Sequence, residues 1–230
     1  MTFDSPLVRG ALLRRWKRFF VDVELPDGSV VTAHCPNTGS MLDCSNPGSP
    51  VFLSASDDPR RRLRWTLELV RAGDALIGVH TGRANRIVEE AIRRRRIPEL
   101  SGWTRWRREA PFEDSRFDFR LEDDQGLQFV EVKNVTHTVH GVALFPDAVT
   151  VRGRKHLRTL VRAVRAGHRG LTVFLVQRAD ATAFRPADAI DREYGVALRQ
   201  AARRGVEIIA WRARPTPRGI VLDSRLPVQL

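Results

Sequence analysis

Apolar runs separated by short turns dominate the first 81 residues. The runs span residues 14–25, 30–35, 51–56, 63–70 and 74–81. The stretch PDGS marks a tight turn, because Pro26 presets φ and Gly28 accepts a positive φ. Five strands with short turns predict a small barrel, and five is the strand number of an OB-fold. Strand number alone leaves an SH3-like barrel as an alternative.

The pattern changes to a helical period at residue 82. Apolar residues recur at helical spacing from Ala84 to Ile92, and Pro98 stops the run. Further helices are predicted at 152–167 and 192–205, and strands at 116–121, 128–135, 171–177 and 206–213. The sequence therefore predicts an α/β (α+β) chain, with a barrel domain over 1–82 and a mixed-sheet domain over 83–230.

The strands 116–121 and 128–135 are predicted to pair as a hairpin. A shared core would fix its parity, because a slip of one residue moves every side chain to the other face. The residues expected in that core are Phe117, Phe119, Val130 and Val132. Asp118, Glu131 and Lys133 then share the opposite face. A two-residue turn at 124–125 would place Asp118 directly opposite Glu131.

Two carboxylates at this separation repel unless a cation or a proton lies between them. Mg²⁺ (or Mn²⁺) fits, because it prefers oxygen ligands and is often held by two carboxylates plus substrate phosphate. Asp118 and Glu131 are the predicted metal ligands, and Lys133 would stabilise charge on a phosphate. The alternative is a network of charges on a strand face, with Lys133 paired to Glu131 and a neighbouring arginine paired to Asp118.

Basic residues outnumber acidic ones, with 39 Lys and Arg against 27 Asp and Glu and a net charge of +12. Such an excess favours a polyanionic partner, because cations on the protein release the counterions of a nucleic acid. A basic surface that serves solubility is the alternative. Only three of the 39 cations are lysines, at positions 17, 133 and 155. Lysine at position 133 therefore looks selected over arginine.

Two groups of residues are predicted to contact nucleic acid. The segment RRWKRF interleaves cations with aromatic rings, which suits stacking of a single strand, although Trp16 and Phe19 could belong to the core. The second group follows the acidic hairpin at the start of a helix. The predicted contacts are Arg14, Arg15, Lys17, Arg18, Arg152, Lys155 and His156.

Few sequence features indicate a location outside the cytoplasm. No run approaches the roughly 18 apolar residues of a membrane helix. The first residues lack the apolar stretch of a secretory signal. Two cysteines are too few for a disulfide framework. A cytoplasmic location is predicted, with no membrane and no obligate protein partner.

Several long stretches in order make the chain resemble the sugar fermentation stimulation protein family (SfsA). They are RRWKRFFVDV, HCPNTGSM, GRANRIVEEAI, SRFDF, EVKNVT, FPDAVTVRGRKHLRTL and AGHRG. The resemblance implies an N-terminal OB-fold and a domain similar to PD-(D/E)xK nucleases. It also implies DNA binding and regulation of sugar (maltose) metabolism genes.

In the nuclease pattern Asp118 matches the first acid, Glu131 the second and Lys133 the lysine. A helical glutamate often precedes them; Glu90 is the better match, with Glu89 as an alternative. The resemblance implies a Mg²⁺-dependent nuclease-like site. The alternatives are a DNA-binding module that keeps the nuclease fold without catalysis, and an RNA-binding or RNA-processing protein, because neither an OB-fold nor basic charge distinguishes the two nucleic acids.

Overall fold

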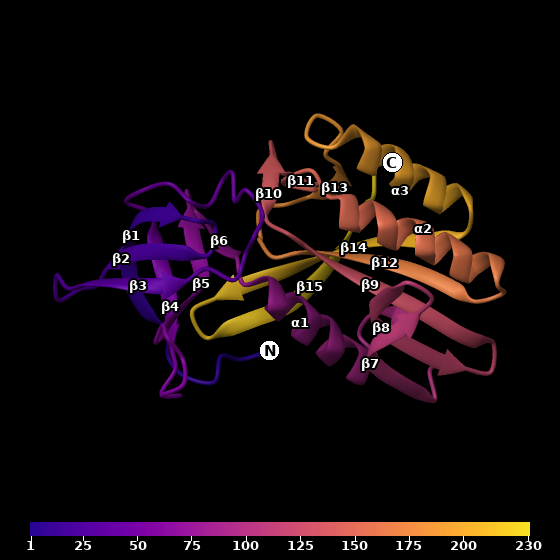
Figure 1. The fold of residues 1–230 in the computed structure, drawn as a ribbon, viewed down its shortest axis with the longest axis horizontal. Helices are drawn as coiled ribbons and strands as arrows, with labels where there is room; N and C mark the ends of the chain where they lie inside the picture. The colour runs from indigo at the N-terminus through magenta and orange to yellow at the C-terminus, as the bar shows by residue number, and fades with distance from the viewer.

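The structure is a computed structural model that describes residues 1–230. It has a strand-rich N-terminal part and a larger α/β part, which lie side by side (Figure 1). The N-terminal strands are β1 (Val8–Trp16), β2 (Phe20–Glu24), β3 (Val30–His34), β4 (Pro50–Ala55), β5 (Trp65–Ala72) and β6 (Ala75–Gly78).

Strands β1 to β5 close into a barrel. Their order is β3-β2-β1-β4-β5, and a parallel pairing of β3 with β5 at Ala33 and Trp65 joins the two edges. Closure removes the exposed strand edges and surrounds a core that includes Leu12, Val21 and Leu67. The predicted five-stranded OB-type barrel is therefore confirmed.

The membership of the barrel differs from the prediction in two places. Residues 14–25 form parts of two strands, because Lys17 and Arg18 adopt φ values of 47° and 62° and turn the chain between β1 and β2. The last predicted strand, β6, lies outside the closed barrel and pairs only with β5 inside this domain. Strand β1 takes the place that the apolar pattern suggested for β6.

The second domain begins with helix α1 and is built on a six-stranded mixed sheet. Its helices are α1 (Thr81–Arg93), α2 (Val151–Arg165) and α3 (Arg192–Arg203), with a 3-10 turn η1 (Pro98–Leu100). The sheet strands are β7 (Arg105–Phe112), β8 (Ser115–Asp123), β9 (Gly126–Val135), β12 (Arg169–Val176), β14 (Val206–Thr216) and β15 (Gly219–Leu226). A small sheet contains β10 (His137–Val139), β11 (Val142–Phe145) and β13 (Ala183–Pro186).

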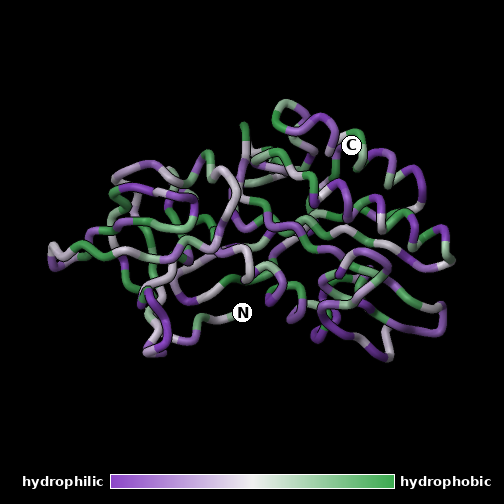
Figure 2. Tube along the Cα trace, in the orientation of Figure 1, coloured by the Kyte–Doolittle hydropathy of each residue, from purple (hydrophilic) through white to green (hydrophobic).

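The order of the large sheet is β15-β14-β12-β9-β8-β7, with the three central strands parallel. Helices α2 and α3 cover one face and α1 the other (Figure 1). Hydrophilic and hydrophobic stretches alternate along α2 and α3, as expected for helices with one face on a sheet (Figure 2). The predicted mixed-sheet domain is confirmed. The sequence did not predict β7 and β15. Both are edge strands with many exposed or half-exposed residues, so their apolar residues do not form a clear pattern.

Each face of the sheet has its own hydrophobic core. Phe119, Val130 and Val132 pack on the α1 side. Phe117 belongs to the α2–α3 side, where its ring lies 5.6 Å from that of Phe129. The prediction that Phe117 shares a core with the other three residues is therefore wrong: the pairing of β8 with β9 begins at Phe119, and Phe117, which precedes it, packs on the other face of the sheet.

Polar contacts join the barrel to the second domain. The backbone N of Gly78, at the end of β6, donates to the carbonyl of Gln177 at 2.9 Å. The hydroxyl of Thr81, the first residue of α1, donates to the Pro36 carbonyl at 2.7 Å. Oδ2 of Asp43 lies 2.6 Å from Nδ1 of His137. No helix in the chain has the length and apolarity to span a membrane.

Candidate active site

A cleft of 570 Å³ lies where the two domains meet. The barrel contributes Arg18 and residues 37–39 to its lining, and the second domain contributes the start of α1, parts of β8 and β9, residues 145–150 and Arg152. Asp118, Glu131 and Lys133 all line this cleft. The structure thus brings together the three residues predicted from the hairpin.

The hairpin has the predicted register, with Phe119 paired to Val130 and Asp123 to Gly126. Pairing stops one step before Asp118 and Glu131, where the strands part. Oδ2 of Asp118 accepts instead a hydrogen bond of 2.7 Å from the backbone N of Val132. The opening between the two strands leaves both carboxylates facing the cleft rather than sealed in a ladder.

Helix α1 contributes an amide to this cluster. Nδ2 of Asn85 donates to Oδ1 of Asp118 at 2.6 Å. Together with the bond from Val132, this contact gives each oxygen of Asp118 one donor. The orientation of the Asp118 carboxylate is therefore fixed from two sides.

Glu131 is buried, with 5% of its surface exposed. Its Oε1 accepts hydrogen bonds from Nζ of Lys133 at 2.5 Å and from Nδ1 of His156. His156 is in turn approached by Nε of Arg152 at 3.4 Å from its Nε2. Oε2 of Glu131 has no protein donor, so one oxygen of the carboxylate stays free for a ligand.

The two acids differ in proton affinity in this environment. Burial, followed by the negative charge of Glu131, raises the pKa of Asp118 to about 6. Burial also acts to raise the pKa of Glu131, but the positive charge of Lys133 and the hydrogen bond of His156 outweigh it and hold that pKa below its ordinary value. Glu131 is thus the permanent anion, and Asp118 takes up a proton more readily.

These residues fit a hard divalent cation, although the protein supplies few ligands. Asp118 and Glu131 offer carboxylate oxygens, and burial followed by the charge of Glu131 raises the pKa of Asp118, so a cation beside it would stabilise its ionised form. The chain has no cluster of three or more His, Cys, Asp or Glu placed to hold a metal ion. Such a cation would complete its shell with water or phosphate oxygens, as Mg²⁺ does.

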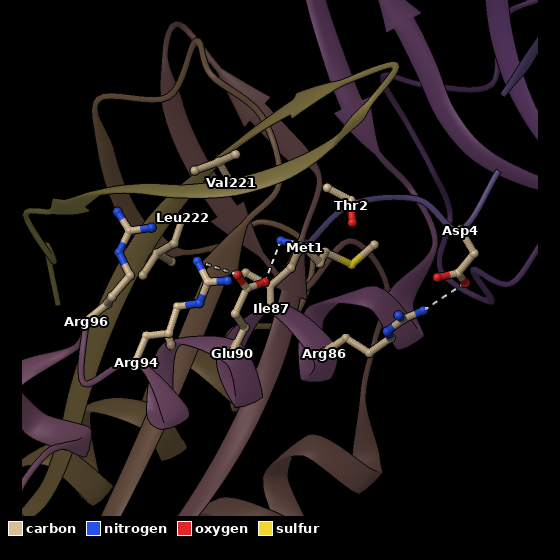
Figure 3. A pocket seen from close by; sticks show the side chains of 11 residues that line it. Met1, Thr2, Asp4, Arg86, Ile87, Glu90, Arg94, Arg96, Val221 and Leu222 are labelled. Atoms are coloured by element: carbon tan, nitrogen blue, oxygen red, sulfur yellow. Dashed lines mark ion pairs between the residues drawn. The ribbon is translucent and has the colours of Figure 1, made fainter. Parts of the chain in front are cut away.

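The predicted helical glutamate does not lie in the cleft. Oε2 of Glu90 lies 2.6 Å from the N-terminal amine of Met1, and Oε1 lies 3.2 Å from Nη1 of Arg94 (Figure 3). The alternative, Glu89, pairs with Arg93 and Arg108. Helix α1 crosses the hairpin nearer its start, so the position facing the acids belongs to Asn85 and Glu90 lines another pocket.

Asn85 was missed because it is an amide, whereas a third acid was expected. One signal in the sequence could have found it. Asn85 borders the apolar stripe of α1 and lies near its N-terminus, the end of the helix that follows the barrel. Its signal was weaker than that of the EE pair at 89–90, which matched the expected residue type.

The four cations at the end of β1 and in the β1–β2 turn have separate roles. Arg15 donates to the carbonyls of Arg18, Asn37, Gly39 and Ser40, and Arg14 pairs with Asp22 at 2.6 Å. Lys17 and Arg18 are exposed, and Arg18 also lines the cleft. Arg15 therefore holds the loop 37–40 in place, while Lys17 and Arg18 remain available for a ligand.

The three residues of the second domain that were predicted to contact nucleic acid also differ in position and role. Arg152 is exposed at the cleft. Nζ of Lys155 donates to the Asp114 carbonyl at 2.6 Å and lies outside the cleft lining. His156 is buried, at 6% exposure, and acts on Glu131 instead of facing a ligand. Only Arg152 of these three residues is both exposed and part of the cleft.

Comparison with known proteins identifies the family. The description "Sugar fermentation stimulation protein RE domain" matches residues 82–219, and "SfsA N-terminal OB domain" matches residues 13–79. The chain belongs to the sugar fermentation stimulation protein (SfsA) family. A "Sugar fermentation stimulation protein homolog" of Syntrophotalea carbinolica is 53% identical over 100% of both chains. One from Geobacter sulfurreducens is 54% identical over 99% of this chain and 98% of the relative.

A solved SfsA structure has the same fold throughout. Pyrococcus furiosus SfsA in complex with Ca²⁺ is 27% identical, with a TM-score of 0.92. The match covers 100% of this chain and 98% of that chain. Ca²⁺, like Mg²⁺, is a hard cation that binds oxygen ligands.

Proposed function

We propose that this SfsA protein binds nucleic acid, with DNA as the preferred partner, and hydrolyses its phosphodiester bonds in the interdomain cleft. One observation carries the proposal: Asp118, Glu131 and Lys133 meet in a cleft that also has the exposed Arg18 and Arg152 in its lining. Acidic residues suit a divalent cation, and the arginines suit phosphate.

The residues have distinct roles in this proposal. Asp118 and Glu131 would hold Mg²⁺ or Mn²⁺, and the ion would supply a more acidic bound water and neutralise charge on the phosphate. Lys133 contacts Oε1 of Glu131 and can donate to a phosphate oxygen as negative charge builds there. Asn85 and His156 position the two carboxylates. Arg18 and Arg152 bind the phosphates on either side.

The test is a cleavage assay with purified protein. Labelled single- and double-stranded DNA and RNA are incubated with Mg²⁺, with Mn²⁺ and with chelator. Wild type and Glu122→Gln, a matched carboxylate on β8 outside the cleft, should cut in a metal-dependent way. Asp118→Asn and Lys133→Ala should lose about 10²–10³-fold of the rate. If wild type cuts none of these substrates but binds them, the hydrolytic part of the proposal fails.

A second candidate function is nucleic-acid binding without cleavage. The observation that favours it is Asn85, a neutral amide at the place where a helical acid was expected. With two carboxylates, the protein offers fewer anionic ligands to a metal than a site with three. In that case the metal would hold a phosphate in place, and binding would depend on Ca²⁺ or Mg²⁺ without product formation.

The cellular role follows from either function. The relatives are called sugar fermentation stimulation protein homologs, and a nucleic-acid-binding protein would act on sugar (maltose) metabolism through gene regulation. RNA is the alternative partner, because an OB-type barrel accepts either nucleic acid. A cytoplasmic location agrees with both partners. Measuring maltose-operon transcripts in a deletion strain tests the regulatory role.

A further inference from the structure

We infer that the cleft admits a single strand of nucleic acid, led in by the β1–β2 turn, and excludes an intact duplex. This inference rests on the proposed function and names its substrate class. Three observations support it: the size of the cleft, the attachment of its two walls, and the chemistry of the surface leading into it.

The cleft is small for a duplex. Its volume of 570 Å³ falls in the range of small-molecule pockets, roughly 300–1,000 Å³. Glu131 is only 5% exposed, so a phosphate must enter the cleft to reach it. A duplex presents its phosphates on the outside of a wide, stiff rod, with a major groove alone about 12 Å across. A single strand can bend and place one phosphate at the acids.

The two walls are tied together. Oδ2 of Asp43 in the barrel accepts a hydrogen bond of 3.0 Å from the backbone N of Thr138 and lies 2.6 Å from Nδ1 of His137. Oδ2 of Asp147 accepts from the backbone N of Met41 at 3.2 Å, and the carbonyl of Asp147 accepts from the Ser40 hydroxyl.

The two walls are also packed closely together at Gly39 of the barrel and Asp147 of the second domain. A Cβ at Gly39 would collide with the carboxylate of Asp147, so a larger residue there would displace that side chain from its contact with Met41. Buried and half-buried polar contacts of this kind are costly to break, since each partner would lose its hydrogen bond. Widening the cleft for a duplex would require breaking several of them at once.

The surface that leads into the cleft suits unpaired bases. Phe19 is 47% exposed at the β1–β2 turn and follows the cleft residue Arg18 in sequence, while Trp16 stacks on Phe20 in the same segment. Nζ of Lys17 lies 5.7 Å from the ring centroid of Trp16. Exposed aromatic rings among cations bind single strands, because bases stack on the rings while the cations follow the backbone. In a duplex the base faces are already stacked and cannot use these rings.

Two exposed valines lie beside the start of helix α2 at the cleft. Val149 and Val151 are each 67% exposed, and Val149 lines the cleft directly. They stand just before and after Thr150, which caps helix α2. Exposed β-branched side chains beside a phosphate site can contact a splayed base. The strand would thus run from Phe19 past Arg18 and the acids to these valines.

Fluorescence anisotropy tests the inference in chelator, so that no strand is cut. The probes are a labelled single strand, the blunt duplex of the same sequence, and that duplex with a single-stranded tail. We expect the single strand and the tailed duplex to bind about tenfold or more tightly than the blunt duplex. Phe19→Ala should weaken single-strand binding about fivefold or more, with little change for the blunt duplex.

Val30→Ala provides the control, because Val30 is an apolar barrel residue that is 61% exposed and lies outside the cleft. It should bind all three probes like wild type. Equal or tighter binding of the blunt duplex by wild type overturns the inference and leaves the proposed function standing. If wild type binds no probe, and none with Mg²⁺ or Ca²⁺ added, both fail. Phe19 is exposed, so its variant is expected to fold, and a thermal melt checks this.

Discussion

Asp118 and Glu131 lie one step beyond the last paired residues of the β8–β9 hairpin, where the strands part and open the cleft. The hairpin register brings them close, and the break in pairing keeps them accessible. This arrangement places repulsion between a half-buried acid, Asp118, and a buried one, Glu131, in the folded state. Their proximity should therefore lower stability at neutral pH while it prepares a cation site.

The first prediction concerns this repulsion. In chelator, Asp118 binds a proton in the folded state up to pH about 6, while the unfolded chain releases it near pH 4. Between these pH values the folded state holds more protons, so the free energy of unfolding falls as pH rises from 4 to 6. The loss should reach about 3 kcal/mol above pH 6.

Asp118→Asn should remove that pH dependence. The free energy of unfolding of the variant should exceed that of wild type at about pH 7.5 and should approach it near pH 4, below which Asp118 is protonated in both states. Urea denaturation across this pH range measures the effect. Added Mn²⁺ should narrow the gap at neutral pH by stabilising wild type. A gap independent of pH would show that the raised pKa of Asp118, which burial and the charge of Glu131 both cause, is not its source.

The second prediction concerns Lys133. Lys133→Met leaves Glu131 buried without its main cation, so the free energy of unfolding should fall by roughly 3 kcal/mol. Lys133→Arg should recover little, because a planar guanidinium does not fit the place of a compact ammonium. Lys155→Met is the control on an exposed surface pair and should cost about 1 kcal/mol or less. Thermal and urea melts compare the three variants.

The third prediction concerns Asn85 as a positioning residue. Asn85→Ala removes the donor to Oδ1 of Asp118 and should weaken Mn²⁺ binding about 10–100-fold. Asn85→Asp adds a third carboxylate and should tighten Mn²⁺ binding relative to wild type. Isothermal titration calorimetry measures both, with Asn46→Ala, in an exposed loop, as control. Unchanged affinity in Asn85→Ala would show that Asn85 does not position Asp118 for the ion.

The fourth prediction concerns the attachment of the two domains. Asp43→Ala leaves His137 and the backbone N of Thr138 without their acceptor and should lower the free energy of unfolding by about 2 kcal/mol. The barrel should then melt more independently of the second domain. Differential scanning calorimetry should show a broader or divided transition. Asp57→Ala, at a side chain that is 95% exposed, should leave a single transition.

The hairpin was predictable from the sequence because its information is local. A side-chain period of two and a two-residue turn fix the register, and the pairing of Phe119 with Val130 follows from them. The absence of pairing before Phe119 was not predictable. It accompanies the packing of Phe117 on the face of the sheet that α2 and α3 cover, and those helices come later in the chain. The acids could be placed near each other, but the opening between their strands could not.

Features that depend on contacts between distant parts of the chain could not be predicted from the sequence, for a related reason. The apolar stripe shows which side of α1 faces the sheet, but not where along the helix the hairpin crosses it. Asn85 and Glu90 therefore could not be distinguished by position, and residue type favoured the wrong one. Barrel closure is likewise non-local, so β6 had the pattern of a barrel strand although β1 occupies that place.

The position of β6 has a consequence for how such chains can vary in length. β6 ends at Gly78, bonded to Gln177, and α1 begins at Thr81, bonded to Pro36. An extra residue within the first turn of α1, between Thr81 and Asn85, would turn Asn85 by about 100° around the helix axis and away from Asp118. The number of residues from Gly78 to Asn85 is therefore constrained. Insertions and deletions among natural variants should spare this segment and collect in remote turns such as 57–63.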